Sequence, residues 1–491
     1  MNSDQPVSGR RAFLTAVGRA GMALGATSVF RSGASLLVPG VTLLRSHDAY
    51  AKTGELLIQP SEIRSKNGVL DATLTAAPGM VQLGDFSFSG FLYNGSYLPP
   101  VLRARTGDVM RISFKNRLPA DPSNLHFHGM SVSPKGNSDN VFVHVHPGGD
   151  FKYEVSIPAH DRQGPGLFWY HPHAHGVVAK QILGGMSGGL VIDGSERLFP
   201  ILQGLPERFL FIKHAEQEQP EREIISINGQ INPVVPIRPG EMQFWRIANI
   251  GATMFMKFRI DAMPLYVVAT DGHPLSRPRK MTEFFIGPGE RIDAIAIGPP
   301  AGRYSMHTIA FHNEAWHQTP DPAQQMATIV SAGTVGSGAE TEVLRQRVKG
   351  ARWIDEVRAA PIARRRTLDY SRTPDRKIFM IDGHTMDENR VDQTARLGDT
   401  EEWTIVNTDQ QYHSFHIHQT PFLVTEVNGV PQDEDSLRDT FSTPPATEVG
   451  PGSLKVVIPF TDPVIVGRFV YHCHAVDHED EGMMGIVEVV A

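Results

Sequence analysis

The feature that most constrains the fold of this 491-residue chain is a pattern that occurs three times. Each copy opens with an Asn-Gly or Asp-Gly pair, continues to a second glycine followed by an acid, and ends at an asparagine. The interval from that second glycine to the asparagine is nine residues in every copy: Gly107 to Asn116, Gly240 to Asn249 and Gly398 to Asn407. The residues between them alternate in polarity as in a β-strand. Copies about 135 to 160 residues apart predict an all-β fold of three tandem Greek-key β-sandwiches.

The ends of the first and third copies also match. The stretch 166–173 (GLFWYHPH) parallels 467–474 (GRFVYHCH), whereas the middle copy keeps only His307 of this pattern. We therefore expect domains at 52–200, 201–330 and 373–491, with a linker at 331–372. The middle domain is predicted to hold no metal and to act as a spacer.

Histidines gather in four short segments at equivalent positions of the first and third copies. Residues two apart in a strand point to the same face, so each His-x-His pair presents two imidazoles to one side. Eight imidazoles that face one another between two related domains predict a metal cluster. These eight are His126, His128, His171, His173, His416, His418, His472 and His474.

The single cysteine, Cys473, lies between two of these histidines. With His413, His478 and Met483 it offers a thiolate, two imidazoles and a weak axial thioether, which is the ligand set of a blue-copper electron-transfer site. A structural zinc site would normally take more cysteines and has no need of the thioether. Pro172 stands at the equivalent position of the first copy and excludes a second site of this kind.

The position of Cys473 also predicts a path for electrons. Its neighbours His472 and His474 point to the opposite face and thus into the cluster. An electron that enters at Cys473 therefore crosses only backbone and imidazole bonds to reach the cluster.

These segments resemble the three-domain multicopper oxidases, which include laccases, bacterial cuprous oxidases and bilirubin oxidases. The resemblance covers essentially the whole mature chain. It implies cupredoxin-like domains, reduction of O2 to water, and four Cu ions: one type 1, one type 2 and two type 3. By this resemblance the type 2 copper takes His126 and His416, one type 3 copper takes His128, His171 and His474, the other takes His173, His418 and His472, and the type 1 copper takes His413, Cys473, His478 and Met483.

Oxygen reduction consumes protons, so carboxylates are expected near the cluster. Glu479 matches the acid that the family uses to feed protons to the type 3 pair. Asp139 matches an acid near the type 2 copper, and a solvated loop residue is the alternative. Asp409, four residues before His413, is placed to bind a metal ion or to accept a phenolic proton, or else it ends the strand that opens after Gly398.

The sequence favours phenols and aromatic amines as reducing substrates. Cuprous oxidases carry a methionine-rich insertion near the type 1 site, and no such run occurs here. The alternative is a periplasmic metallo-oxidase that oxidises Cu(I), Fe(II) or Mn(II) in copper tolerance. Two other classes are disfavoured. A copper-free exported structural protein of the same fold would have lost ligands, whereas all eleven His and Cys ligands and Met483 are present here. A copper nitrite reductase is a two-domain trimer without type 3 pairs, and the third domain and the four histidine segments argue against it.

Residues 1–51 have the features of a twin-arginine (Tat) export signal. Arg10 and Arg11 precede a Gly/Ala-rich apolar stretch, and Ala49 and Ala51 offer a cleavage site. We therefore predict export through the Tat translocon to the periplasm, or secretion. No later run approaches 18 apolar residues, so no membrane span is expected.

The net charge of −7 excludes the basic footprint of a nucleic-acid-binding protein. Because both cluster domains lie in one chain, a monomer suffices for the predicted activity.

Overall fold

The computed structural model describes residues 54–160, 162–218, 221–313, 322–350 and 352–491. The predicted export signal lies outside these residues. Strands dominate the described chain and form six sheets, which pair into three sandwiches. The predicted all-β class with three tandem sandwiches is therefore confirmed.

The first sandwich contains the first two histidine segments. One of its sheets has the strand order β1 (Glu62–Arg64), β4 (Val101–Ala104), β9 (Gly188–Ile192), β8 (Gly166–His171), β6 (His126–His128). The other has the order β3 (Phe86–Tyr93), β2 (Val69–Leu83), β5 (Val109–Asn116), β7 (Asp150–Ser156). Three short helices follow β8 or β9: α2 (Val178–Leu183), α3 (Ser195–Leu198) and the 3-10 helix η1 (Pro200–Leu202).

The middle sandwich has a six-stranded and a five-stranded sheet. The first has the order β11 (Glu221–Ile227), β10 (Glu207–Glu218), β13 (Met242–Asn249), β18 (Arg291–Ile297), β15 (Leu265–Thr270), β16 (His273–Met281). The second has the order β12 (Val234–Ile237), β20 (Gln325–Ser331), β19 (Gly302–Ile309), β14 (Met256–Ile260), β17 (Glu283–Ile286).

The third sandwich contains the remaining histidine segments and the cysteine. One sheet has the order β22 (Phe379–Ile381), β21 (Arg364–Arg372), β24 (Thr400–Asn407), β29 (Gly452–Pro459), β26 (Leu423–Val427), β27 (Val430–Pro431). The other has the order β23 (Gln393–Arg396), β31 (Met484–Val490), β30 (Gly467–Cys473), β25 (His413–Ile417), β28 (Thr440–Thr443). The 3-10 helix η2 (Pro463–Ile465) precedes β30, and α6 (Val476–Asp480) follows it.

The repeated asparagine has the same structural role in all three sandwiches. Strands β5, β13 and β24 each end on it, at Asn116, Asn249 and Asn407. Its side-chain amide donates to a main-chain oxygen four or five residues later, on Asp121, Met254 or Gln411. The amide thus fixes the corner at which the chain leaves the strand, and in the first and third copies this corner leads directly into a histidine segment.

The predicted linker, residues 331–372, is partly structured. It contains α4 (Glu340–Leu344) and α5 (Trp353–Ala359). Its last nine residues form β21, which pairs in parallel with β24. Residues 364–372 are therefore part of the third sandwich. The run of arginines at 364–366 did not reveal this strand in the sequence. In the structure these side chains lie on the outside of the strand or against acids of β24.

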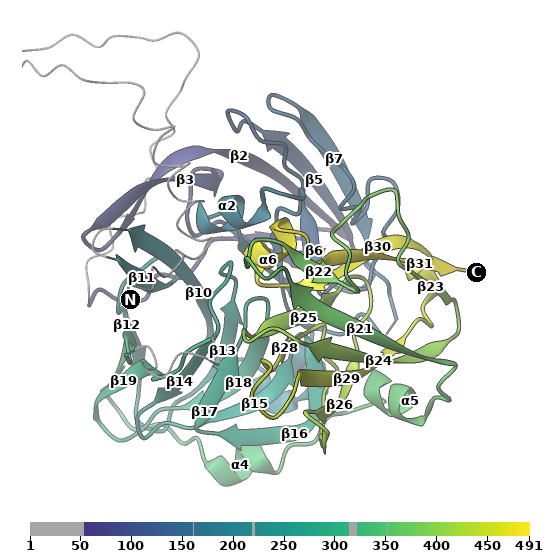
Figure 1. Ribbon diagram of the computed structural model, residues 1–491. Helices are drawn as coiled ribbons and strands as arrows, with labels where there is room; N and C mark the ends of the chain where they lie inside the picture. The colour runs from purple at the N-terminus through teal and green to yellow at the C-terminus, as the bar shows by residue number, and fades with distance from the viewer. Residues whose placement is uncertain (1–53, 161, 219–220, 314–321, 351) are drawn as a thin grey trace, which may run out of the picture.

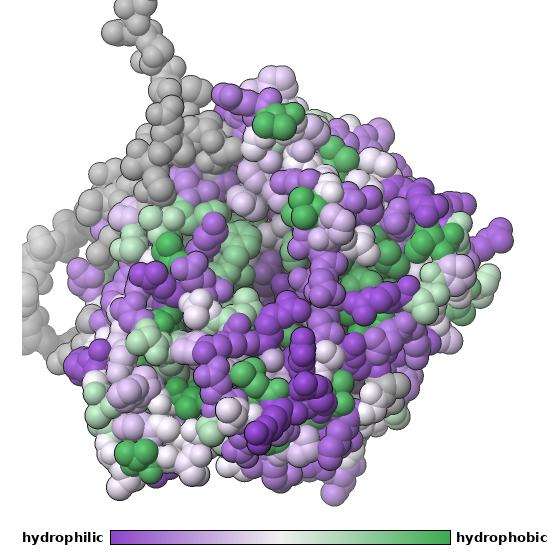
Figure 2. Space-filling view, turned by 90° about the horizontal axis from the view of Figure 1, so that it is seen from below, coloured by the Kyte–Doolittle hydropathy of each residue, from purple (hydrophilic) through white to green (hydrophobic). Residues whose placement is uncertain are grey.

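The first and third sandwiches lie side by side, and Figure 1 shows α6 and β30 (yellow) next to α2 and β6 of the first sandwich. The middle sandwich (teal) lies at the lower left of this view. Figure 2 shows a face covered mostly by hydrophilic residues, with hydrophobic ones in small separate groups. Among the described residues, no helix is both long and apolar enough to span a membrane.

Candidate metal centres

The strand pairing places the histidine segments of the first and third sandwiches in equivalent positions. In the first sandwich β6 pairs with β8, so that His126 lies opposite His171. In the third, β25 pairs with β30, so that His416 lies opposite His472. The predicted equivalence of the two domains is thus seen in the register of their strands.

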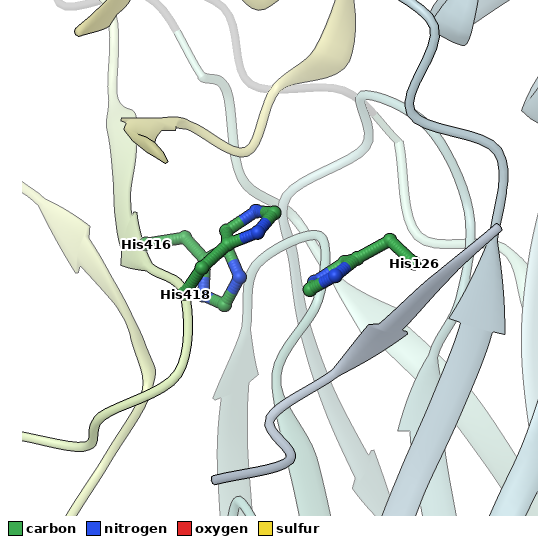
Figure 3. A group of neighbouring side chains, drawn as sticks. All are labelled: His126, His416 and His418. Carbon is green, nitrogen blue, oxygen red and sulfur yellow. The ribbon is translucent and has the colours of Figure 1, made fainter. Parts of the chain in front are cut away.

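The two sets of histidines face each other across the interface between the sandwiches. Figure 3 shows His126 of the first sandwich directed toward His416 and His418 of the third. The rings of His126 and His418 stack at 3.8 Å, and those of His128 and His416 stack at 4.0 Å. All eight predicted cluster histidines are buried, and each ring contacts other rings of the set.

Ring nitrogens of the cluster approach one another closely. His472 Nε2 lies 3.1 Å from His173 Nε2 and 3.2 Å from His418 Nε2. On the other side of the cluster, His474 Nε2 lies 3.2 Å from His128 Nδ1. Contacts of this kind between imidazole lone pairs are expected where the nitrogens share a cation.

Burial keeps these imidazoles in the form that binds metal. It lowers the pKa of His126, His128, His171, His173, His416, His418 and His474 below the ordinary value, so the rings are neutral.

Main-chain oxygens select the tautomer of three rings. The Nδ1–H groups of His171, His416 and His472 donate to the carbonyls of Pro172, Asp439 and Cys473 at 2.9, 2.7 and 2.9 Å. Their Nε2 atoms are left as lone pairs that point into the cluster. In the described part of the chain, the Nε2 atoms of His126, His171 and His416 have no hydrogen-bond partner, so their lone pairs are free to coordinate a copper ion.

Several groups of these residues can each hold one ion, because their ligand atoms lie within 4.8 Å of one another. Four of the groups are His126, His416, His418; His126, His128, His171; His173, His418, His472; and His413, Cys473, His478. Imidazole and thiolate donors suit copper, so the residues fit the metal that the sequence predicts.

The fourth group lies within the core of the third sandwich. Cys473 Sγ is 3.5 Å from His413 Nδ1 and 3.6 Å from His478 Nδ1. Burial raises the pKa of the Cys473 thiol, so it becomes a thiolate only when a cation binds beside it. Met483 is buried in the same apolar cluster of residues, and its main-chain oxygen accepts from the Cys473 amide at 3.1 Å. The phenyl ring of Phe379 stacks on His478 at 4.1 Å and closes one side of the group.

Glu479 connects the two domains at the cluster. It is fully buried, with its carboxylate oxygens 3.4 Å from His173 Nδ1 and 3.1 Å from His472 Nδ1. These nitrogens lie on the outer edges of rings whose Nε2 atoms point inward. The structure therefore brings Glu479 into contact with the cluster, as the sequence predicted.

Asp139 also lies at the cluster, so the alternative of a solvated loop residue is wrong. Its carboxylate oxygens lie 3.1 Å from His126 Nδ1, and the residue is 1% exposed. Burial raises its pKa to about 7, although the Phe127 amide and the Gln419 side chain donate to it and oppose the shift. A carboxyl group with this pKa can release and take up a proton near neutral pH.

Asp409 is buried beside the group of His413, Cys473 and His478 and not on an open surface. Its Oδ2 lies 3.3 Å from His413 Nε2, and its Oδ1 pairs with Arg372 Nε at 2.7 Å. Burial acts to raise the pKa of Asp409, but the contacts with His413 and Arg372 outweigh it and lower the pKa. Because β24 ends at Asn407, Asp409 also follows a strand end, as one alternative predicted.

Sequence reasoning did not find Asp439, Thr440 and Arg291. Asp439 Oδ1 and Thr440 Oγ1 each lie 3.0 Å from His128 Nε2, and Arg291 pairs with Asp439. His128 and Asp439 are 311 residues apart, and neither Asp439 nor Thr440 belongs to a spacing pattern. No signal in a single sequence marks such a contact.

Family models cover nearly all of the described chain. Three models, each described as multicopper oxidase, match residues 80–197, 169–332 and 360–491. The chain therefore belongs to the multicopper oxidase family. It is a copper-dependent oxidoreductase that uses O2 as the electron acceptor, and four copper ions are typical of this family.

Individual relatives are distant but cover most of the chain. The chain is 25% identical to a multicopper oxidase of Staphylococcus haemolyticus, with 91% of this chain and 97% of the relative covered. It is 26% identical to a laccase of Bacillus stratosphericus, over 81% and 90% of the two chains. Among solved structures, the multicopper oxidase of Campylobacter jejuni, described as a metallo-oxidase, aligns with a TM-score of 0.76 at 23% identity and covers 93% of this chain and 99% of its own.

Proposed function

We propose that this protein is a laccase-like oxidase that takes single electrons from phenols and aromatic amines and reduces O2 to water. Bound copper supplies the one-electron redox chemistry and the site where O2 is reduced. The observation that carries the proposal is the position of Cys473, whose side chain lies in the type 1 group while the flanking histidines reach the cluster. The ligand roles are those implied by the family resemblance, with His413, Cys473, His478 and Met483 at the type 1 copper and the remaining eight histidines at the cluster.

The residues around His413 support an organic substrate. The charge of Asp409 is already offset by Arg372, so a metal ion would have to displace a guanidinium to bind it. Tyr412, next to His413, is half-buried and packs against Phe285 and Phe311 with ring centroids 5.4 and 5.6 Å away. An aromatic surface of this kind suits stacking of a phenol ring.

Oxidation of a metal ion is the second candidate, because an acidic pair lies near the other type 1 histidine. Asp477 Oδ1 lies 3.9 Å from His478 Nε2, with the side chain 26% exposed. Burial and the charge of Asp477 raise the pKa of Glu481 to about 7. A cation bound between these carboxylates would be close to the electron-accepting copper.

Oxygen uptake by the copper-loaded protein separates the two candidates. Methoxyphenol and stabilised Cu(I) are compared for the wild type, for D477N, and for D150N, which removes an exposed acid of the first sandwich as a matched control. Faster uptake with the phenol, unchanged in D477N, supports the laccase-like function. Faster uptake with Cu(I), with a loss of tenfold or more in kcat/KM for Cu(I) in D477N alone, would establish the metallo-oxidase instead. Fewer than three coppers per chain after growth in ample copper would overturn both and favour a copper-free structural protein.

We also propose that the chain is exported by the Tat pathway and works in the periplasm as a monomer. Arg10 and Arg11 of the N-terminal segment support the export route. Retention of an R10K/R11K variant in the cytoplasm, with processing of the wild type near Ala51, is the expected result. Light scattering of the purified protein at the mass of one chain tests the monomer.

A further inference from the structure

The middle sandwich, predicted to be a spacer, contacts the copper cluster. The turn at residues 287–291, which leads into β18, lies against the rings of His128 and His474. A Cβ atom on Gly289 would lie 3.2 Å from both rings. Gly289 has a φ of +90°, so the backbone itself approaches the histidines.

Arg291, at the end of this turn, ties the three sandwiches together. Its Nη1 and Nη2 atoms donate to the two oxygens of Asp439 of the third sandwich, both at 2.6 Å. Its Nε donates to the Leu167 carbonyl of the first sandwich at 3.2 Å, and its Nη1 to the Gly289 carbonyl at 3.1 Å. Both members of the Arg291–Asp439 pair are buried, and such a bidentate pair holds the carboxylate in one orientation.

The oriented carboxylate determines which nitrogen of His128 carries the proton. Asp439 Oδ1 accepts from Arg291 and from the Thr440 hydroxyl, and the carboxylate has only lone pairs to offer to His128. His128 Nε2, at 3.0 Å, must therefore be the N–H donor. The lone pair is then on Nδ1, which faces His474 Nε2. This is opposite to His171, His416 and His472, whose Nδ1 atoms are the donors.

We propose that Asp439 is a positioning residue that, held by Arg291 of the middle sandwich, makes His128 present Nδ1 to its copper ion. This inference rests on the proposed function, since it assigns His128 to the type 3 pair. The middle sandwich thereby takes part in building the cluster. Gly129 supports the assignment, because a Cβ there would lie 2.5 Å from both Arg291 Nη2 and Asp439 Oδ2. The His-x-His-Gly turn is thus shaped to let the ion pair reach His128.

The test replaces the ion pair by apolar residues of similar size, R291M/D439L, so that no unpaired charge is left buried. The control, R246M/D293L, removes another buried ion pair of the middle sandwich, in which Arg246 Nη1 lies 2.7 Å from Asp293 Oδ2. Asp293 lies on β18 two residues after Arg291, and the pair has no hydrogen bond to a cluster histidine among the described residues.

Copper content, the blue type 1 absorption, the near-ultraviolet absorption of the type 3 pair and the electron paramagnetic resonance spectrum are recorded for each protein. We expect R291M/D439L to keep the blue absorption but to bind type 3 copper 10- to 100-fold more weakly, as reported in general for changes to the partners of metal-bound histidines. The control is expected to keep all four coppers. Full type 3 absorption in R291M/D439L, or equal loss in the control, would overturn the proposal.

A second measurement uses the wild-type protein and so does not depend on whether a variant folds. Nitrogen-15 NMR of copper-free wild-type protein with labelled histidine reports which nitrogen of His128 is protonated. A proton on Nε2 supports the proposal, and a proton on Nδ1 overturns it. The wild-type protein tests the proposed function separately, by its copper content and its oxygen uptake with phenols. If it binds four coppers and consumes O2 with phenols, the proposed function holds, and the role of Asp439 is then decided by the variants and by the tautomer of His128.

Discussion

Replacing Glu479 with glutamine tests whether this carboxylate delivers protons for oxygen reduction. The side chain is fully buried and lies between His173 Nδ1 at 3.4 Å and His472 Nδ1 at 3.1 Å. Glutamine has nearly the same shape, so the packing is kept. It cannot exchange a proton, so the change removes one chemical property and leaves the geometry in place.

The structure predicts a small effect on stability and a large one on turnover. The Nδ1–H of His472 already donates to the Cys473 carbonyl at 2.9 Å, so this nitrogen keeps its main hydrogen bond when Glu479 is replaced by glutamine. We expect the free energy of unfolding of the copper-free protein to fall by about 1 kcal/mol. A positioned acid or base contributes about 10²- to 10⁴-fold to a rate, so turnover of E479Q is expected to fall by that factor, which corresponds to about 3 to 5 kcal/mol in the barrier.

The assay follows oxygen uptake at saturating methoxyphenol, together with copper content and blue absorption. Bleaching of the blue colour by phenol without oxygen is expected to keep its wild-type rate, whereas recolouring on addition of oxygen becomes slow. D480N is the control, because Asp480 is the neighbouring, half-buried carboxylate and accepts from the amides of Val178 and Ala179 instead of contacting a histidine. An E479Q protein with four coppers and turnover within threefold of the wild type would refute the proton-delivery role.

Two further predictions concern Cys473 and Asp139. C473S is expected to lose the blue absorption and nearly all turnover while it keeps the other three coppers; a blue, active variant would remove the proposed electron path. Burial raises the pKa of Asp139 to about 7 from roughly 3.9 in an unfolded chain, so its contribution to stability is complete below about pH 4 and is lost as the pH rises through about 7, up to about 4 kcal/mol. In urea titrations of the copper-free proteins, D139N is therefore expected to show a flatter pH dependence than the wild type, and coincident curves would contradict the assignment.

The β-sandwich architecture could be predicted because its signals are local. An Asn-Gly or Asp-Gly pair marks a tight turn, and the structure has Asn94, Asn228 and Asp382 at φ values of 53°, 54° and 53°. The nine-residue interval to the next asparagine measures one strand, and repetition of the interval reveals three related domains. Residues 364–372 carry no such signal, and their place in the third sandwich depends on pairing with β24.

The candidate ligands could be predicted for a similar reason. Strand geometry puts residues two apart on one face, so the His-x-His and His-Cys-His motifs indicate metal binding within three residues of sequence. The burial of Asp139 could not be predicted from sequence, because it lies thirteen positions after His126 and nothing local says where the chain between them turns. Only the fold buries it against the ring.

The sequence by itself determined the strand repeats, the residue types that bind copper and their distribution over two related domains, because each of these is encoded over a few neighbouring residues. The tertiary structure alone decided which rings stack across the interface, that Asp409 is paired with Arg372, and that Arg291 of the middle sandwich holds Asp439 against His128. These contacts join residues tens to hundreds of positions apart. They arise from the way three sandwiches pack, and packing depends on the shape of the whole molecule and not on any local pattern.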